Sequence, residues 1–312
     1  MDIDDDLVHA LQEDGRVSVQ DLSRRLGVSR ATVATRLQTM FDSGAVRVVA
    51  AVDPGFLGQH VLAHLMISAA GPARPIAAAL AAYEQAVLVS AVGGAPDLIA
   101  EVRSGSRAEL HDLVRAIRAI PTVTAVETHV YSSVIKGLLV SGHQGETTID
   151  DIDVALIEQL QRDGRTSFRA LGDAVRLSPS SVAVRVRRLI DNRVIRISTV
   201  ETRTVTQRQL PLGIGIVLRG DDDTVVEYLT QRRGVDFAAR VIGRFDVLAT
   251  LLERSSEALL QIMEDLRAMA GVGHVEAWVH LSVQKEDYSR TITEPALRTI
   301  RALRNPTNSP YA

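Results

Sequence analysis

The sequence predicts an α+β protein in which two winged-helix-type helix-turn-helix domains alternate with two ferredoxin-like βαββαβ domains. Three observations predict this order. The chain repeats itself at a fixed offset, each copy opens with short amphipathic helices, and each copy then changes to short β-rich runs alternating with helices. At 312 residues, the chain is long enough for two to four domains of ordinary size.

A tandem duplication organises the chain. Asp14-Gly15-Arg16 recurs 149 residues later as Asp163-Gly164-Arg165. At that offset, residues 3–50 and 152–199 share about 16 identities in 48 positions without a gap. The register continues in four further pairs: Gly94/Gly243, Asp97/Asp246, Val123/Val272 and Val126/Val275. We therefore expect two structurally equivalent halves.

The duplication and its polar breaks predict the domain boundaries. The predicted segments are a helix-turn-helix domain at 1–52, a βαββαβ domain at 60–137, a linker at 138–150, a second helix-turn-helix domain at 151–200, a second βαββαβ domain at 210–290 and a tail at 291–312. The tail has no counterpart in the first half, and its sequence leaves a short helix and a disordered segment equally open.

Composition restricts the classes of function. An apolar content of 46% and a charged content of 23% are typical of a soluble globular protein. The chain has no run of 18 apolar residues and begins with acidic residues, so we expect a cytoplasmic protein with no membrane partner. With no cysteine, disulfides and thiolate metal sites are excluded. The net charge of −3 means that nucleic-acid binding would depend on local basic patches.

Each copy begins with three short helices. In the first copy, apolar residues at helical spacing end before a turn pair, and Ser18 is placed to cap the second helix. Gly27 suits a positive φ before Ser29, which is placed to cap a third helix at 30–43, and a strand is expected at 46–52. The second copy repeats this plan through Ser167, Leu171, Val175, Ser178, Pro179, Val182, Val186 and Leu189.

The outward positions of the third helix predict contacts with double-stranded DNA. Small and hydrogen-bonding side chains let a helix approach the major groove, and an arginine on its flank suits phosphate. The alternative is a packing module with a solvated face. The predicted DNA-binding residues are Arg30, Ala31, Thr32, Thr35, Arg36, Gln38, Thr39, Ser180, Ser181, Val184, Arg185, Arg187 and Arg188.

Charge distinguishes the two copies. Residues 1–52 hold six arginines against eight acidic residues, whereas residues 151–200 hold nine arginines against six. Because attraction to phosphate grows with each basic contact, we expect the second copy to bind DNA more strongly.

After each helix-turn-helix region the pattern changes to that of a split βαβ fold. In the first copy we expect, in order, strand 61–68, helix 72–83, strands 87–92 and 98–102, helix 107–119 and strand 123–131. In the second copy the equivalents are 214–218, 224–232, 237–242, 247–252, 256–270 and 275–281. Such a sheet leaves one face without helices, and this face carries too many aliphatic residues to remain exposed to solvent. The two fused sheets are therefore expected to pack on each other.

The order and spacing of these marks resemble the Lrp/AsnC (feast/famine) family of transcriptional regulators. The matching segments are Ile3-Asp4-x-Asp6-Leu7, Asp14-Gly15-Arg16, Val28-Ser29-x-x-x-Val33-x-x-Arg36-Leu37, Val52-Asp53-Pro54-x-x-Leu57-Gly58 and Gly94-x-x-Asp97. The resemblance implies RAM-like effector domains, a small-molecule effector such as an amino acid, no cofactor, and homo-oligomers, here dimers or tetramers of the fused chain.

The resemblance also implies an effector site. The family's turn falls on Gly94-Ala95-Pro96-Asp97 and on Gly243-Arg244-Phe245-Asp246, and its threonine falls on Thr128, where the second copy has Ala277. A carboxylate on such a turn suits an ammonium group, although a plain turn-forming aspartate is equally open. The predicted effector-binding residues are Gly94, Asp97, Thr128, Gly243, Arg244 and Asp246.

An enzyme is the competing class. The sirohaem decarboxylases have the same architecture and use histidines, but this chain lacks an HExxH motif, a phosphate loop and a nucleophile elbow. His60 and His64 enter a predicted strand and lie roughly 13 Å apart there, too far to share a metal ion. We interpret His129 and His280 as core or surface residues. The sequence therefore predicts a non-enzymatic protein without catalytic or metal-binding residues, and a sensor that has lost DNA binding stays open.

Overall fold

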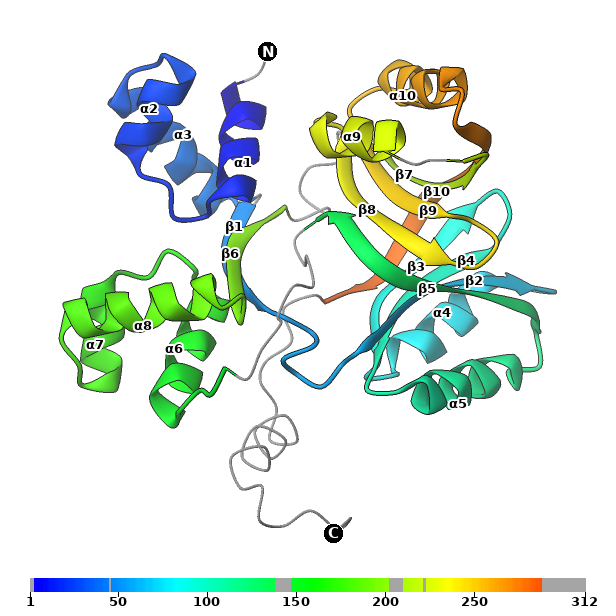
Figure 1. Ribbon diagram of the computed structural model, residues 1–312, viewed down its shortest axis with the longest axis horizontal. Coiled ribbons are helices and arrows are strands. Elements are labelled where there is room, and N and C mark those ends of the chain that lie inside the picture. The colour runs from blue at the N-terminus through cyan, green and yellow to red at the C-terminus, as the bar shows by residue number, and fades with distance from the viewer. Residues whose placement is uncertain (1–2, 45, 138–146, 202–209, 221–222, 288–312) are drawn as a thin grey trace, which may run out of the picture. The chain divides into compact units, whose positions relative to one another are not determined.

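The computed structural model describes residues 3–44, 46–137, 147–201, 210–220 and 223–287 (Figure 1). They fall into two compact units. One unit contains both helix-turn-helix regions, and the other contains both βαββαβ regions. In the described part of the chain, no helix is both long and apolar enough to span a membrane.

Each helix-turn-helix region has three helices and a strand. The first comprises α1 (Ile3–Glu13), α2 (Val19–Leu26), α3 (Arg30–Asp42) and β1 (Val46–Val52). The second comprises α6 (Asp151–Arg162), α7 (Phe168–Val175), α8 (Pro179–Asp191) and β6 (Ile195–Glu201). The third helix and the strand thus lie within one residue of their predicted positions in the first copy.

Serine side chains begin the second and third helices of both copies, as predicted. Ser18, Ser29, Ser167 and Ser178 each accept a hydrogen bond from the backbone N–H three residues later. These bonds satisfy donors that have no partner within the helix. The turn before each third helix is left-handed, with φ of +67° at Gly27 in the first copy.

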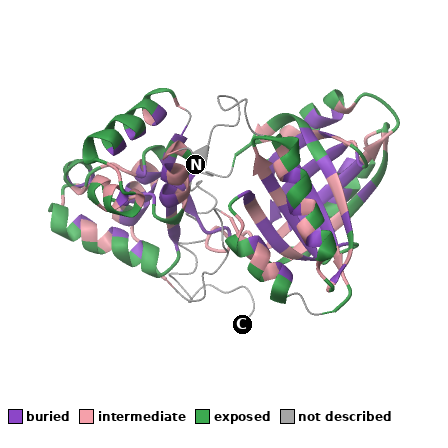
Figure 2. Ribbon diagram, turned by 90° about the horizontal axis from the view of Figure 1, so that it is seen from above, coloured by how far each residue is buried: buried purple, intermediate pink, exposed green. Residues whose placement is uncertain are grey.

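Each set of helices encloses its own aliphatic core. Leu7, Leu11, Leu22 and Val33 have no exposed surface in the first copy, and Leu156, Leu171, Val182 and Leu189 have none in the second. Figure 2 shows that the outer faces of these helices are largely exposed. Burial of one stripe per helix therefore leaves the opposite stripe available for contacts.

The two copies are joined through their strands. Strand β1 pairs antiparallel with β6, from Val46 opposite Glu201 to Val52 opposite Ile195. The repeated glycines contact this ribbon, because Gly164 N donates to Val48 O over 2.8 Å and Gly15 N donates to Ile197 O over 3.3 Å. A Cβ at either glycine would lie within 3.0 Å of a neighbouring atom, so both approaches require glycine.

The other unit is a closed barrel of eight strands. The first half supplies β2 (Val61–Ala69), α4 (Ala73–Ala81), β3 (Ala86–Gly93), β4 (Leu98–Ser104), α5 (Arg107–Arg118) and β5 (Val123–Lys136). The second supplies β7 (Leu210–Leu218), α9 (Asp223–Gln231), β8 (Val235–Ile242), β9 (Val247–Glu253), α10 (Ser256–Ala268) and β10 (Val272–Glu286). Around the barrel the order is β10-β3-β4-β2-β5-β8-β9-β7, with α4 and α5 on one side and α9 and α10 on the other (Figure 1).

The last strand of each half is longer than predicted. Strand β5 continues five residues beyond the predicted end, and β10 continues equally far. The extra residues pair with the opposite half: Ser133–Lys136 with β8, and residues 282–286 with β3. A prediction that treats the halves separately has no partner for these residues, so it ends both strands too early.

The expected packing of the two helix-free faces is confirmed by this barrel. Two cores lie under the helices, one centred on Leu65 and Ile67 and the other on Ile214 and Ile216. A third cluster lies between the two sheets and contains Met66, Val92, Ile99, Val241, Phe245, Leu248 and Trp278. The barrel interior is thus walled by residues of both halves.

Candidate functional site

The two third helices present the predicted DNA-contacting residues to solvent. Every member of that set is exposed except Arg185, which is partly buried. The outer face of α3 carries Thr35, Gln38 and Thr39, and that of α8 carries Val184, 66% exposed, and Arg187. The two helices therefore offer different chemistry at equivalent positions.

The flanking arginine has a structural partner in both copies. Arg185 Nη1 lies 2.8 Å from carboxylate oxygens of Asp150 and Asp153, and Arg188 also pairs with Asp153, which has no exposed surface. In the first copy, Arg36 lies 3.5 Å from Asp4, the equivalent of Asp153. These aspartates hold the third helix against the first. Arg185 is thus a positioning residue within this structure.

The polar turns of the barrel unit use their aspartates internally. Asp97 Oδ2 accepts a hydrogen bond from Ala69 N over 2.8 Å, and Asp246 Oδ2 accepts one from Leu218 N over 2.7 Å. Thr128 lies opposite Leu65 in the ladder and so faces the helix-covered core. The two turns lie against the closing strand of the opposite half, since a Cβ on Gly94 would lie 3.5 Å from Ala277 O and one on Gly243 would lie 2.2 Å from His129 Nδ1. Effector binding by these residues stays a prediction.

Arg244 bridges two glutamates of the barrel unit. Its guanidinium donates to Glu127 over 3.0 Å and to Glu276 over 2.6 Å, and lies 4.3 Å from the centre of the Phe245 ring. Glu127 and Glu276 are equivalent residues of the two copies, on β5 and β10. One arginine thus joins the closing strands of both halves.

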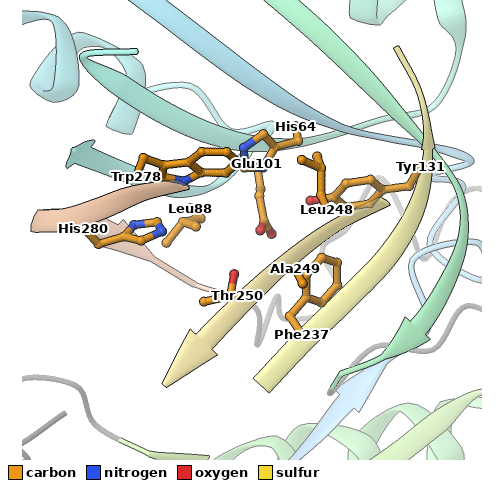
Figure 3. Close-up of a pocket in the computed structure, with 10 residues that line it drawn as sticks. All are labelled: His64, Leu88, Glu101, Tyr131, Phe237, Leu248, Ala249, Thr250, Trp278 and His280. Atoms are coloured by element: carbon orange, nitrogen blue, oxygen red, sulfur yellow. The ribbon is translucent and has the colours of Figure 1, made fainter. Parts of the chain in front are cut away.

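A polar chamber lies inside the barrel, between the two sheets (Figure 3). The cavity has a volume of about 10 Å³, which is room for roughly one water molecule. Residues from both halves line it, among them His64, Glu101, Tyr131, Thr250, Trp278 and His280. Figure 3 shows the side chains of His64, Glu101 and His280 gathered around Trp278.

Several buried polar atoms of this interior have no hydrogen-bond partner among the described residues. They are His64 Nε2, both ring nitrogens of His129, and Trp278 Nε1. The ring centroid of His64 lies 5.9 Å from the ring centroid of Trp278 and 6.5 Å from that of His129. A buried polar atom without a partner is costly, so these atoms indicate a site for water or a ligand.

Burial keeps the interior histidines neutral. It lowers the pKa of His64 to about 3, with smaller contributions from His129 and His280, and it also lowers the pKa of His129. Each neutral ring can donate one hydrogen bond and accept one. Among the described residues, no three histidine, aspartate or glutamate side chains are grouped to hold a metal ion.

Sequence reasoning missed this chamber. It treated His129 and His280 as scattered strand residues, because the strands that bring them together are far apart in the chain. A signal was nevertheless present in β5, where Glu127, His129 and Tyr131 alternate with Val126, Thr128 and Val130. Polar and aromatic residues on the helix-free face of a predicted sheet indicate a polar interior.

Comparison with protein-family models identifies both domain types. The AsnC-type helix-turn-helix domain matches residues 2–40 and 149–190, and the Lrp/AsnC ligand binding domain matches residues 63–138. The first match occurs twice, in agreement with the internal repeat.

Curated relatives match one half of the chain over most of their own length. The HTH-type transcriptional regulator FL11 of Pyrococcus furiosus is 28% identical over 137 residues, which cover 43% of this chain and 91% of that protein. The HTH-type transcriptional regulator LrpC of Bacillus subtilis is 31% identical over 116 residues, covering 36% and 78%.

Solved structures show the same fold over the whole chain. The siroheme decarboxylase NirDL superposes with a TM-score of 0.62 at 15% identity, covering 97% of this chain and 99% of that one. Its co-complex with an iron-uroporphyrin III analogue gives 0.63 at 14% identity, covering 98% and 100%. The sequence relatives and the domain matches agree, and the chain belongs to the Lrp/AsnC family, in a tandem form with two AsnC-type helix-turn-helix regions.

Proposed function

We propose that the chain is a sequence-specific DNA-binding transcriptional regulator whose two recognition helices contact unlike half-sites, and that it responds to a small-molecule effector. The observation that carries this proposal is the exposure of the outer faces of α3 and α8. Both helices begin at a serine cap, so the N-terminal residues that approach base edges are held in position.

The side chains on the two helices favour different bases. Gln38 suits adenine, whereas Arg187 suits guanine and the exposed Val184 suits the methyl group of thymine. Since the two helices belong to one chain, their half-sites need not be palindromic. The second copy also carries the larger excess of arginine and is expected to supply more of the affinity.

The experiment is selection of bound fragments from genomic DNA, followed by gel shifts on the selected site. Arg187→Ala is expected to weaken binding about 5- to 150-fold, which corresponds to about 1–3 kcal/mol for a lost bidentate contact. Arg162→Ala removes an equal charge from the exposed end of α6 and serves as the control. Failure to bind any fragment at low salt would contradict the proposal and favour a sensor without DNA binding.

Replacing thymine by uracil removes only the methyl group that Val184 would contact. In the second half-site, this replacement is expected to weaken binding by the wild type and to leave Val184→Ala unaffected. If the replacement weakened binding of both proteins equally, Val184 would not be the residue that contacts the methyl group.

An amino acid remains the proposed effector class from the family, with the fused chain acting as a dimer or tetramer in the cytoplasm. Light scattering at increasing protein concentration tests the assembly, since a monomer at all concentrations would contradict it.

Tetrapyrrole decarboxylation is the second candidate function. The whole-length fold likeness to siroheme decarboxylase NirDL favours it, as do the buried histidines of the barrel. The chamber fits a tetrapyrrole poorly, since even drug-sized ligands occupy pockets of about 300–1,000 Å³ and Trp278 and Phe245 fill much of this interior. Adding an iron porphyrin and recording its absorption spectrum tests this candidate. A shifted Soret band that is lost in His64→Phe would support it, and an unchanged spectrum would exclude it.

A further inference from the structure

Two arginines beside the second recognition helix have an uncommon backbone conformation. Arg176 caps the end of α7 with φ of +57°, and Arg193 lies between α8 and β6 with φ of +54° (Figure 1). In the described part of the chain, they are the only residues other than glycine with a positive φ. This left-handed conformation is strained for a residue with a Cβ, and retained strain is typical of functional positions. Both strained residues border the same helix, one at each end.

The first copy has the same two turns with glycine. Gly27 and Gly44 occupy the equivalent positions, with φ of +67° and +68°. A Cβ at either glycine would meet no atom within 4 Å, so lack of space does not explain the glycines. The turns thus keep their geometry in both copies. The second copy has replaced the residue that adopts this geometry without strain by one that carries a charge.

The turns use only the backbone of these arginines. Arg176 N donates a hydrogen bond to Gly172 O, and Arg193 N donates one to Ile190 O over 2.9 Å. Both side chains are exposed, and neither forms a hydrogen bond or an ion pair with another described residue. Their guanidinium groups are therefore available to a partner outside the chain.

Arginine is concentrated around the third helix of the second copy. Residues 176–193 contain five arginines, whereas the equivalent residues 27–44 contain two. Two of the five pair with the buried Asp153, and a third lies on the outer face of α8. The remaining two are the turn arginines, Arg176 and Arg193. The added positive charge thus lies on α8 and at both of its ends.

We propose that the turn arginines bind DNA phosphates and hold α8 in the major groove from both ends. This inference rests on the proposed function, in which α8 enters DNA. In helix-turn-helix complexes, the helix before the recognition helix crosses the phosphate backbone, and Arg176 caps that helix, α7. With 13 residues, α8 is about 20 Å long and exceeds the major groove's width of about 12 Å, so its ends come near the backbones that border the groove. A guanidinium there suits bidentate contact with phosphate oxygens.

The strain makes stability and DNA binding respond in opposite directions to one change. Arg176→Gly combined with Arg193→Gly restores the glycines of the first copy. The strain is then relieved in the free protein, so the melting temperature is expected to equal or exceed that of the wild type. The same double variant is expected to bind DNA more weakly, because it lacks two phosphate contacts. A purely structural role for the arginines would lower the melting temperature and leave DNA binding unchanged.

Binding is measured as a function of salt concentration on the full chain. The probes are a duplex selected from genomic DNA and an unrelated duplex of equal length. Each lost phosphate contact makes the plot of log K against log salt shallower by about 0.9, so the double glycine variant is expected to lose about 1.8 from the slope on both duplexes. The affinity advantage of the wild type then shrinks about tenfold between about 50 and 200 mM salt.

Two controls separate charge from backbone effects. Arg176→Lys combined with Arg193→Lys keeps both charges and both strained turns, so the slope and the melting temperature should remain those of the wild type. Arg162→Ala removes a charge from the exposed end of α6 and should keep the slope. An unchanged slope in the double glycine variant, or a loss confined to the selected duplex, would overturn this inference and leave the proposed function in place. A wild type that binds neither duplex at low salt would overturn both.

Discussion

Arg16 and Arg165 occupy equivalent positions of the two repeats, and each donates two hydrogen bonds to the backbone of the other repeat. Arg16 contacts Gly164 O at 2.7 Å and Thr166 O at 3.0 Å. Arg165 contacts Gly15 O at 2.8 Å and Val17 O at 3.2 Å. The most recognisable repeated motif of the sequence is therefore the contact that fastens the two helix-turn-helix regions together.

Arg165→Ala is expected to weaken the contact between the two helix-turn-helix regions. The variant leaves two carbonyl oxygens without their charged donor, and we expect a loss of about 2 kcal/mol from the unfolding free energy of this unit. Denaturant unfolding followed by circular dichroism measures the loss. Arg24→Ala, an exposed arginine on α2, is the control and should change the stability by less than about 0.5 kcal/mol. Equal effects of the two variants would contradict a joining role for Arg165.

The buried Asp153 is expected to contribute more to the stability of the fold than its equivalent Asp4. Asp153→Ala removes the carboxylate that pairs with Arg188 and one of the two that pair with Arg185, and we expect a loss of about 3 kcal/mol, since Arg185 keeps Asp150 and both guanidinium groups keep some contact with water. Asp4→Ala breaks a longer contact to the exposed Arg36 and should cost about 1 kcal/mol or less. Thermal unfolding of the two variants side by side tests the ranking. A larger loss for Asp4→Ala would show that burial does not set the strength of this pair.

Local features of the fold were predictable from the sequence because neighbouring residues decide them. Ser29 and Ser178 each accept a hydrogen bond from the backbone N–H three residues later, so the serine and its near neighbours are enough to predict where the helix begins. The repeat then doubled every such observation, and the aliphatic density of the strands predicted that the two sheets would pack on each other.

Contacts between distant segments were not predictable in the same way. The phosphate contact of Arg185 stays a prediction, but its pairing with Asp153 was not foreseen, because a helix wheel shows the flank of α8 and does not show Asp153 on another helix. The chamber was missed for the same reason. His64 and His280 are 216 positions apart, and only the register of the closed barrel brings them to one space.

The left-handed turn before the third helix predicts opposite effects in the two copies. Gly27 has φ of +67° with open space around it, so Gly27→Ala adds only backbone strain and should cost about 1–2 kcal/mol. Arg176 holds φ of +57° at the equivalent position, and Arg176→Gly should stabilise the second copy by about 1 kcal/mol. Arg176→Asn, which also tolerates this conformation, separates the strain from the loss of charge. Melting temperatures give the signs, and destabilisation by Arg176→Gly would contradict the strain argument.

The buried His64 predicts that acid destabilises the barrel. Its pKa is about 3 in the folded protein, against about 6.5 when the chain is unfolded. Between these values the unfolded state binds a proton that the folded state does not, so the unfolding free energy falls as the pH falls below 6.5. The slope from this group approaches about 1.4 kcal/mol per pH unit, or about 2 kcal/mol between pH 6.5 and 5. His129, whose pKa burial also lowers, acts in the same direction.

His64→Phe is expected to remove this part of the pH dependence, whereas the exposed His274→Phe is expected to retain it. Urea unfolding of the three proteins at pH 7.0, 6.0 and 5.0 measures the slopes. If the wild type and His64→Phe lost stability in parallel on acidification, the histidine would have to be in contact with water, and its burial would be contradicted.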